Sequence, residues 1–292
     1  MAAKSLANGR RPTSAREYGP MLALALITPF VMLLFGGFLY PVGALLWGSI
    51  FVPEATLANY ARILHEPLFL LVLWRTFEIA FVVTALALLL GYPVALAMAR
   101  VSGRSALLIA ACVLIPLWTS VLVRSYAWIV LLQRNGLVNN ALIETGLTDA
   151  PLRLLYTQGA VIAAMTQVLL PFMILPIYSV VRNIPDDLVR AARNLGAGSF
   201  QAFVRVTLPL SFPGVSAGVL ITFILSLGFY ITPALLGGPS TLMMSTLIGQ
   251  QTTELLDWPF AGALATTLLF ATLLLVIVFR RALALNKGFK LG

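Results

Sequence analysis

Six long apolar runs constrain the fold more than any other feature of this sequence. They lie at residues 21–48, 75–99, 105–132, 157–181, 210–232 and 261–283. About 20 apolar residues suffice to cross the hydrocarbon core of a bilayer as a helix. Irregular backbone cannot face lipid, and the strict alternation of a membrane β-barrel is absent from the sequence. The runs therefore predict an all-α membrane protein with six transmembrane helices.

The composition agrees with a lipid bilayer as the solvent of this chain. Of its 292 residues, 60% are hydrophobic and only 10% are charged, which is more apolar surface than a soluble domain can bury. The net charge of +9 does not indicate nucleic-acid binding, because the basic residues cluster at the ends of the apolar runs. The single cysteine, Cys112, excludes a disulfide within the chain, and no metal site is expected.

The distribution of Lys and Arg predicts the orientation of the six runs. Fourteen of the nineteen basic residues lie at the two ends of the chain, near residues 100–104 and between residues 182 and 205. Seven of the ten acids lie on the opposite side of a six-span layout. By the positive-inside rule, both termini face the cytoplasm. The chain then divides into a cytoplasmic segment 1–20, a six-helix transmembrane domain 21–283 and a cytoplasmic tail 284–292.

The polar segment 184–209 falls on the predicted cytoplasmic side. Pro185 fixes φ for a first helical turn, and Asp186 and Asp187 place carboxylates at the positive end of the helix dipole. Asp186 is also within reach of Arg190 at i+4. The apolar stripe of this helix recurs at helical spacing, with small residues at its centre: Leu188, Ala191, Ala192 and Leu195. A short amphipathic helix is therefore predicted here.

A second short helix is expected after a reversal of the chain. Gly196 and Gly198 permit a sharp turn, and Ser199 is placed to cap the next helix. Together the two helices would form an exposed surface that a partner protein could grip. The alternative is an amphipathic hairpin lying on lipid headgroups.

The spacing of this segment resembles the cytoplasmic loop motif of ABC importer permeases, which reads Glu-Ala-Ala, three residues, Gly, nine residues, Ile-x-Leu-Pro. Ala191, Ala192 and Gly196, nine further residues and then Val206-Thr207-Leu208-Pro209 keep that spacing, with Arg190 at the position of the Glu. The resemblance implies a type I importer permease fold in which the loop docks as a coupling helix on an ATP-hydrolysing subunit. The coupling residues it implies are Asp187, Arg190, Ala191, Ala192, Gly196, Leu208 and Pro209.

Two further stretches narrow the resemblance. "IPLWTSVLVRSYAWIVLLQRNGLVNN", residues 115–140, and "FYITPALLGGPSTLMMSTLIGQQ", residues 229–251, resemble spermidine/putrescine-type permeases. The resemblance implies a multi-pass protein of the bacterial inner (plasma) membrane that imports a polyamine. It also implies a second permease subunit, identical or homologous, two ATPase subunits and a periplasmic or extracellular solute-binding protein.

The residues themselves only partly favour a polyamine, because a di- or trication requires carboxylates or aromatic faces. The one acid near a span is Glu78, expected in the first turn of the second run, where it could pair with Arg75. Arg124 could equally bind a substrate carboxylate, so an opine-like or amino-acid-derived solute stays open. The candidate path residues are Glu78, Trp118, Ser120, Arg124, Tyr126, Trp128, Phe229 and Tyr230. For the aromatic ones, the alternative role is helix packing or an interface belt.

The sequence lacks the groups that other function classes require. No phosphate-binding Gly-x4-Gly-Lys-Ser/Thr motif occurs, so ATP and Mg²⁺ are expected on a separate ATPase, and no cofactor is expected on this chain. An ion-coupled carrier would need mid-span acids and usually internal repeats. An intramembrane enzyme would need a constellation of His, Asp or Glu in the spans, whereas the lone His65 is expected in an outer loop. A transport subunit is therefore predicted, with the outer loop 233–259 facing the solute-binding protein.

Overall fold

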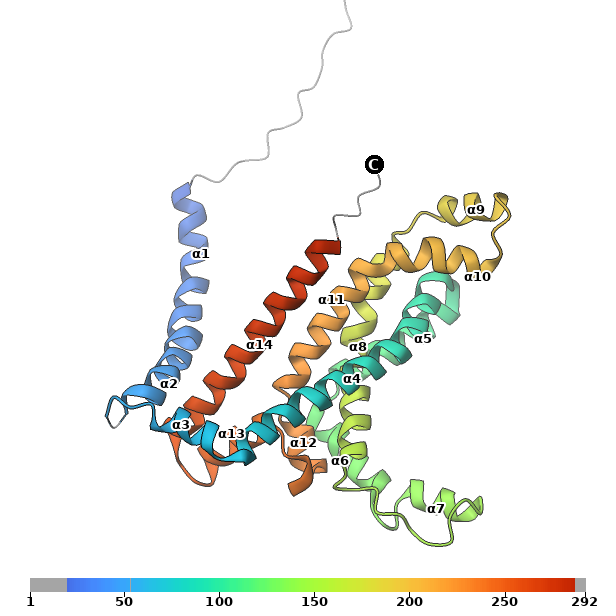
Figure 1. Ribbon diagram of the computed structural model, residues 1–292. Helices are drawn as coiled ribbons and strands as arrows, with labels where there is room; N and C mark the ends of the chain where they lie inside the picture. The colour runs from blue at the N-terminus through green and yellow to red at the C-terminus, as the bar shows by residue number, and fades with distance from the viewer. Residues whose placement is uncertain (1–19, 53, 287–292) are drawn as a thin grey trace, which may run out of the picture.

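The chain folds into helices of very unequal length, joined by short connections (Figure 1). The computed structural model describes residues 20–52 and 54–286, and within these ranges it contains helices and no strand. The N-terminal rod combines α1 (Pro20–Leu34), the π-helical turn η1 (Phe35–Leu39) and α2 (Tyr40–Phe51). The amide of Tyr40 bonds to the carbonyl of Phe35, five residues back. This wider turn directly precedes Pro41, which has no amide hydrogen to continue an α-helical ladder.

Three long helices form the centre of the molecule: α4 (Pro67–Arg100), α8 (Gln158–Arg182) and α11 (Leu208–Leu227). Small residues bring α8 and α11 into close contact. A Cβ added at Gly214 would lie 2.8 Å from the carbonyl oxygen of Pro176, and one at Gly218 would lie 2.9 Å from the sulfur of Met173. Because lipid is as apolar as a leucine side chain, helices in a membrane associate through such close packing rather than through the hydrophobic effect.

A second group of helices lies beside this centre. It contains α3 (Ala58–His65), α13 (Met244–Thr253) and α14 (Trp258–Asn286), whereas α12 (Ile231–Leu236) and the 3-10 turn η3 (Pro239–Thr241) contact α8. The rings of Phe69 and Phe260 meet edge to face in its core, with centroids 5.0 Å apart. The amide of Met244 donates to the hydroxyl of Thr76 at 2.8 Å, which ties α13 to α4.

The apolar runs become membrane-length helices with one exception. Five helices among the described residues are long and apolar enough to cross a bilayer. The run predicted as one span at 105–132 is instead broken into α5 (Gly103–Trp118) and α6 (Val121–Leu132), followed by α7 (Leu137–Glu144). The two parts of this pair bend by 102°. Pro116 weakens the end of α5, and Ser120 starts α6 by accepting a hydrogen bond from the Leu122 amide at 3.3 Å.

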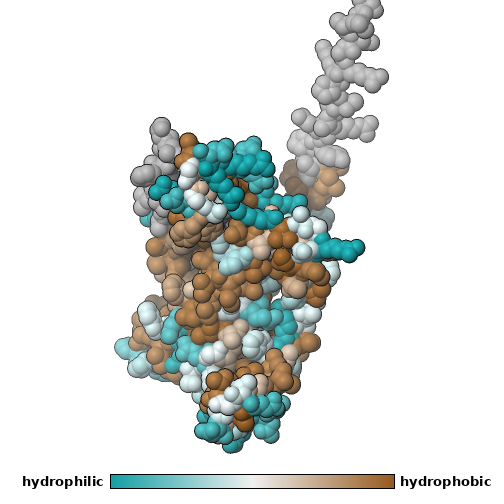
Figure 2. Space-filling view, turned by 90° about the vertical axis from the view of Figure 1, so that its right-hand side faces the viewer, coloured by the Kyte–Doolittle hydropathy of each residue, from teal (hydrophilic) through white to brown (hydrophobic). Residues whose placement is uncertain are grey.

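The polar parts of the molecule lie at its two ends (Figure 2). The space-filling view shows a hydrophobic band between hydrophilic surfaces at the top and the bottom. In Figure 1, α1 begins and α14 ends at the end that carries α9 (Asp186–Asn194), while α7 lies at the opposite end. Of the predicted tails 1–20 and 284–292, residues 1–19 and 287–292 lie outside the described residues, and residues 284–286 are the end of α14.

Candidate functional site

The first candidate site is the coupling segment, residues 184–209. Its helix α9 begins after Pro185 and carries Asp186 and Asp187 in its first turn, as predicted. Asp186 and Arg190 do not form an ion pair, although their i, i+4 spacing would allow one. Within the described ranges, the ion pairs are those of Arg62 with Glu66 and Asp257. Both Asp186 and Arg190 instead line a cavity of about 290 Å³ at the end of α4.

Gly196 ends α9 in the manner its position predicts. Its φ is +89°, and a Cβ there would meet nothing within 4 Å. The Ala197 amide donates to the Ala192 carbonyl at 3.0 Å, and the Gly196 amide donates to the Arg193 carbonyl at 2.9 Å. This pair of bonds is a Schellman motif, in which a left-handed residue closes the helix. The backbone conformation, rather than a lack of space, therefore restricts this position to glycine.

The predicted second short helix is wrong as an independent element. Ser199 is the first residue of α10 (Ser199–Ala202), and Gly198 rather than Ser199 occupies the cap position. The helix continues through the π-helical turn η2 (Phe203–Thr207) directly into α11. The segment thus contains one separate helix, α9, which a short turn joins to a long helix that runs from Ser199 to Leu227. Local sequence marks the start of a helix but cannot show whether it merges with the next one.

Exposed apolar residues occur among the charged ones on α9 and its turn. Leu195 is 89% exposed and Phe200 is 77% exposed, and Leu188 and Ala191 are also exposed. Ala192 is half-buried, and it lines a hollow of about 250 Å³ together with Leu195, Gly196, Ala197, Gln201 and Arg205. The structure therefore gathers five predicted coupling residues on α9 and its cap. Leu208 and Pro209 are exposed at the start of α11, outside this hollow.

Polar contacts tie the coupling segment to the C-terminal end of α4. Arg100 donates from Nη2 to the hydroxyl of Thr207 at 3.0 Å, and Thr207 is buried. The hydroxyls of Tyr92 and Ser211 lie 3.0 Å apart, and the Tyr92 ring meets Phe203 edge to face. Sequence reasoning missed these contacts because their partners are over 100 residues apart, and no local pattern marks them.

The second candidate site is the predicted substrate path, which centres on the elbow between α5 and α6. Trp118 ends α5 and is 91% exposed, and Tyr126 on α6 is also exposed. Trp128 donates to Gln167 of α8 at 3.4 Å, and both Trp128 and Phe229 pack against one buried core cluster. These two path residues therefore pack on the same core, whereas Trp118, Tyr126 and Tyr230 are exposed.

A buried hydroxyl pair joins α6, which carries three of the path residues, to α12, which directly follows Phe229 and Tyr230. Ser125 of α6 and Thr232 of α12 are both fully buried, and their hydroxyls lie 2.9 Å apart. Neither residue, nor Gln167, was singled out from the sequence. A serine or threonine in an apolar helix gives no signal of its partner, because its hydroxyl can equally bond a backbone carbonyl one turn back.

The two charged path residues occupy different environments. Glu78 lies about three turns into α4 rather than in its first turn, because the helix begins at Pro67. It is exposed, makes no ion pair with Arg75, and accepts a hydrogen bond from Gln158 at 3.4 Å. Arg124 is half-buried, and its Nε and Nη1 atoms are buried without a hydrogen-bond partner among the described residues. A guanidinium without acceptors is costly in an apolar environment, so Arg124 is suited to an acceptor from outside this chain.

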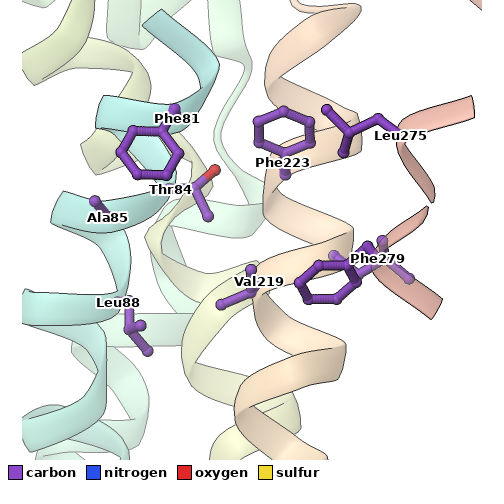
Figure 3. Close-up of a pocket in the computed structure, with 9 residues that line it drawn as sticks. Phe81, Thr84, Ala85, Leu88, Val219, Phe223, Leu275 and Phe279 are labelled. Atoms are coloured by element: carbon purple, nitrogen blue, oxygen red, sulfur yellow. The ribbon is translucent and has the colours of Figure 1, made fainter. Parts of the chain in front are cut away.

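A third hollow is unsuited to a polar solute (Figure 3). It has a volume of about 360 Å³ and lies between α4, α11 and α14, where Phe81, Phe223 and Phe279 face it. Its lining contains no charged group, and the one hydroxyl, that of Thr84, donates to the Ala80 carbonyl. Within residues 20–52 and 54–286, no three His, Cys, Asp or Glu side chains gather as metal ligands.

Comparisons with known proteins agree on one kind of relative. Residues 18–287 match the family model described as the binding-protein-dependent transport system inner membrane component. The chain is 38% identical over 227 residues to the spermidine/putrescine transport system permease protein PotB of Haemophilus influenzae, covering 78% of this chain and 79% of that protein. It is 35% identical over 237 residues to PotB of Escherichia coli, covering 81% and 86%.

A solved structure shares the fold. It is that of a bacterial alginate ABC transporter in complex with an alginate pentasaccharide-bound periplasmic protein, and it matches with a TM-score of 0.72 and 20% identity. The match covers 89% of this chain and 92% of the other.

Proposed function

The chain belongs to the family of binding-protein-dependent transport system inner membrane components, and from this premise we propose that it forms the membrane path of an ATP-driven polyamine importer. Its relatives are transport permeases, and it is a transport subunit rather than an enzyme. The proposed cargo is spermidine, putrescine or a related amine. The support for this cargo is the identity of over a third to spermidine/putrescine permeases across about four-fifths of the chain.

The main support for an ATP-driven mechanism is the position of α9, an exposed helix that a short turn joins to the long helix Ser199–Leu227. Its open face of Ala191, Ala192 and Leu195 suits a cleft on an ATPase subunit that holds ATP and Mg²⁺. Because α10, η2 and α11 are continuous, a displacement of α9 would move α11 directly. The bond between Arg100 and Thr207 would pass the same displacement to α4.

The proposed arrangement in the membrane follows from charge and from the placement of helix ends. Counting the bent pair α5–α6 as one span gives six spans, with both termini and α9 in the cytoplasm of a bacterium. The start of α1, the end of α14 and α9 all lie at the same end of the molecule, which supports this orientation (Figure 1). The proposed complex contains a second permease subunit, identical or homologous, two ATPase subunits and a solute-binding protein on the outer side.

A second candidate cargo is favoured by one observation. The two unpartnered donors of Arg124 suit a carboxylate, as an opine or an amino-acid-derived solute would supply. The exposed rings of Trp118 and Tyr126 and the carboxylate of Glu78 favour a cation instead.

The mechanism is tested at the hollow of α9. We expect Ala192→Glu and Gly196→Asp to abolish spermidine uptake and to weaken co-purification of the ATPase. The first change fills the hollow with a charge, and the second forces a side chain into a left-handed conformation, at about 1 kcal/mol or more. Arg190→Glu, which introduces the usual residue of the importer motif, should retain uptake unless the ATPase carries an acidic contact there.

The matched control is Thr145→Glu, which adds the same charge to an exposed site just after α7, at the end of the molecule opposite α9 (Figure 1). Membrane levels of all variants are compared by immunoblot. Wild-type uptake in both Ala192→Glu and Gly196→Asp would mean that α9 is a hairpin on lipid and does not couple to an ATPase.

A further inference from the structure

A charged cavity lies at the end of the molecule opposite α9. The connections on either side of α7 enclose about 430 Å³, lined by residues 132–134 and 151–156. Arg134 and Arg153 both contribute to this lining, and both are exposed. Within the described part of the chain, neither guanidinium forms an ion pair with an acid. The cavity therefore presents two cations that form no ion pair with the described part of this chain.

One buried side chain connects the two walls of the cavity through hydrogen bonds. Asn139 of α7 is fully buried, and its Nδ2 donates to the carbonyls of Gln133 at 3.2 Å and Leu152 at 3.0 Å. Its Oδ1 accepts from the Leu152 amide at 2.9 Å. These three bonds clamp the two connections together and fix the backbone that carries both arginines. A ligand would lose little binding energy to ordering such a site.

The cavity is also connected to the elements of the predicted path. Tyr156 lies in its wall with a φ of +61°, a conformation that costs a non-glycine residue energy. A Cβ added at Gly238 would lie 3.1 Å from the Tyr156 carbonyl oxygen, so the cavity wall touches the outer loop next to η3. Two residues after Tyr156, Gln158 starts α8 and bonds to Glu78. An occupant of the cavity would thus press on both α8 and the η3 loop.

We propose that this cavity receives an acidic side chain of the solute-binding protein when that protein docks on the transporter. The proposal rests on the proposed function, which places α7 on the outer side of the membrane. Charge complementarity supports this occupant, because paired guanidinium groups bind carboxylates through bidentate hydrogen bonds. The volume admits an aspartate or glutamate side chain together with adjoining residues, and the clamp by Asn139 provides the defined geometry that a protein partner requires. Docking then reaches the path through Tyr156 and Gln158.

The test measures docking through ATP hydrolysis by the whole transporter. The chain is assembled with its paired permease and ATPase subunits in nanodiscs of phosphatidylcholine, and solute-loaded binding protein is titrated in. For Arg134→Gln/Arg153→Gln, we expect the half-stimulating concentration of binding protein to rise about tenfold, with the maximal rate unchanged. The matched control Thr145→Glu/Leu147→Glu makes the same change in net charge just after α7, at two exposed residues that do not line the cavity. We expect it to shift that concentration by at most about twofold.

Three outcomes would overturn the assignment of the cavity. The arginine variant responding like the wild type would exclude docking at these side chains, and an equal shift in the control would indicate a general electrostatic field. A shift that appears only in nanodiscs containing anionic phosphatidylglycerol would identify the cavity as a lipid-headgroup site. A wild-type complex that the binding protein does not stimulate at all would instead contradict the proposed function.

Discussion

Arg124 and Glu78 are the charged residues that we expect to distinguish a cationic cargo from an anionic one. Glu78 is exposed near the start of α8 and makes one hydrogen bond, at 3.4 Å, so its carboxylate is available to an amine. Arg124 has buried donors that a dication cannot satisfy. We therefore expect Glu78→Gln to lower spermidine uptake about tenfold, the usual order for a lost charge pair.

Arg124→Gln is expected to leave spermidine uptake within about threefold of the wild type, since an amide keeps donors at this site. Initial rates with labelled spermidine measure both variants, normalised to the amount of protein in the membrane. A large loss with Arg124→Gln, combined with an unaffected Glu78→Gln, would favour the carboxylate-bearing cargo instead.

The elbow between α5 and α6 is the element that carries most of the predicted path residues. A helix break exposes backbone groups that lipid cannot satisfy, so such breaks in membrane proteins lie against protein or a water-filled cavity. We expect single cysteines at Ser120, Tyr126 and Phe229, in a Cys112→Ser background, to react with a small water-soluble thiol reagent. Their reaction rates should change when substrate is transported.

Leu274→Cys is the control for this labelling, because Leu274 is exposed in the middle of α14, where lipid is the expected neighbour. Labelling is quantified by mass spectrometry of the intact protein. Complete protection of all three elbow positions in every state would place them in packing rather than along a path.

The whole molecule is expected to cross the membrane with its α9 end inside. Fusions of an activity reporter at Ala3 and Leu291 should both report the cytoplasm, and an insertion at Asp149, beyond α7, should report the outside. The physical reason is the concentration of Lys and Arg at the α9 end, which resists translocation. A reporter at Leu291 that is active outside the cell would contradict six spans, and it would also remove the basis for a docking cavity beside α7.

Local patterns in the sequence determined the class of the protein and much of the coupling segment. Apolar runs of membrane length and the bias of basic residues act over short stretches, so they predicted helices and their direction. The start of α9 at Asp186 and the left-handed turn at Gly196 also follow from local backbone preferences. The spacing of the loop motif around Ala192 also indicated the family of importer permeases.

Only the tertiary structure decided how these pieces meet. The elbow at Ser120, the fusion of α10 with α11 and the bond from Arg100 to Thr207 depend on groups distant in sequence. The same holds for the unsatisfied donors of Arg124 and for the clamp of Asn139 beneath Arg134. Hydropathy reports how much apolar surface a segment carries, whereas partners and cavities depend on which faces pack together, and a single sequence does not encode that locally.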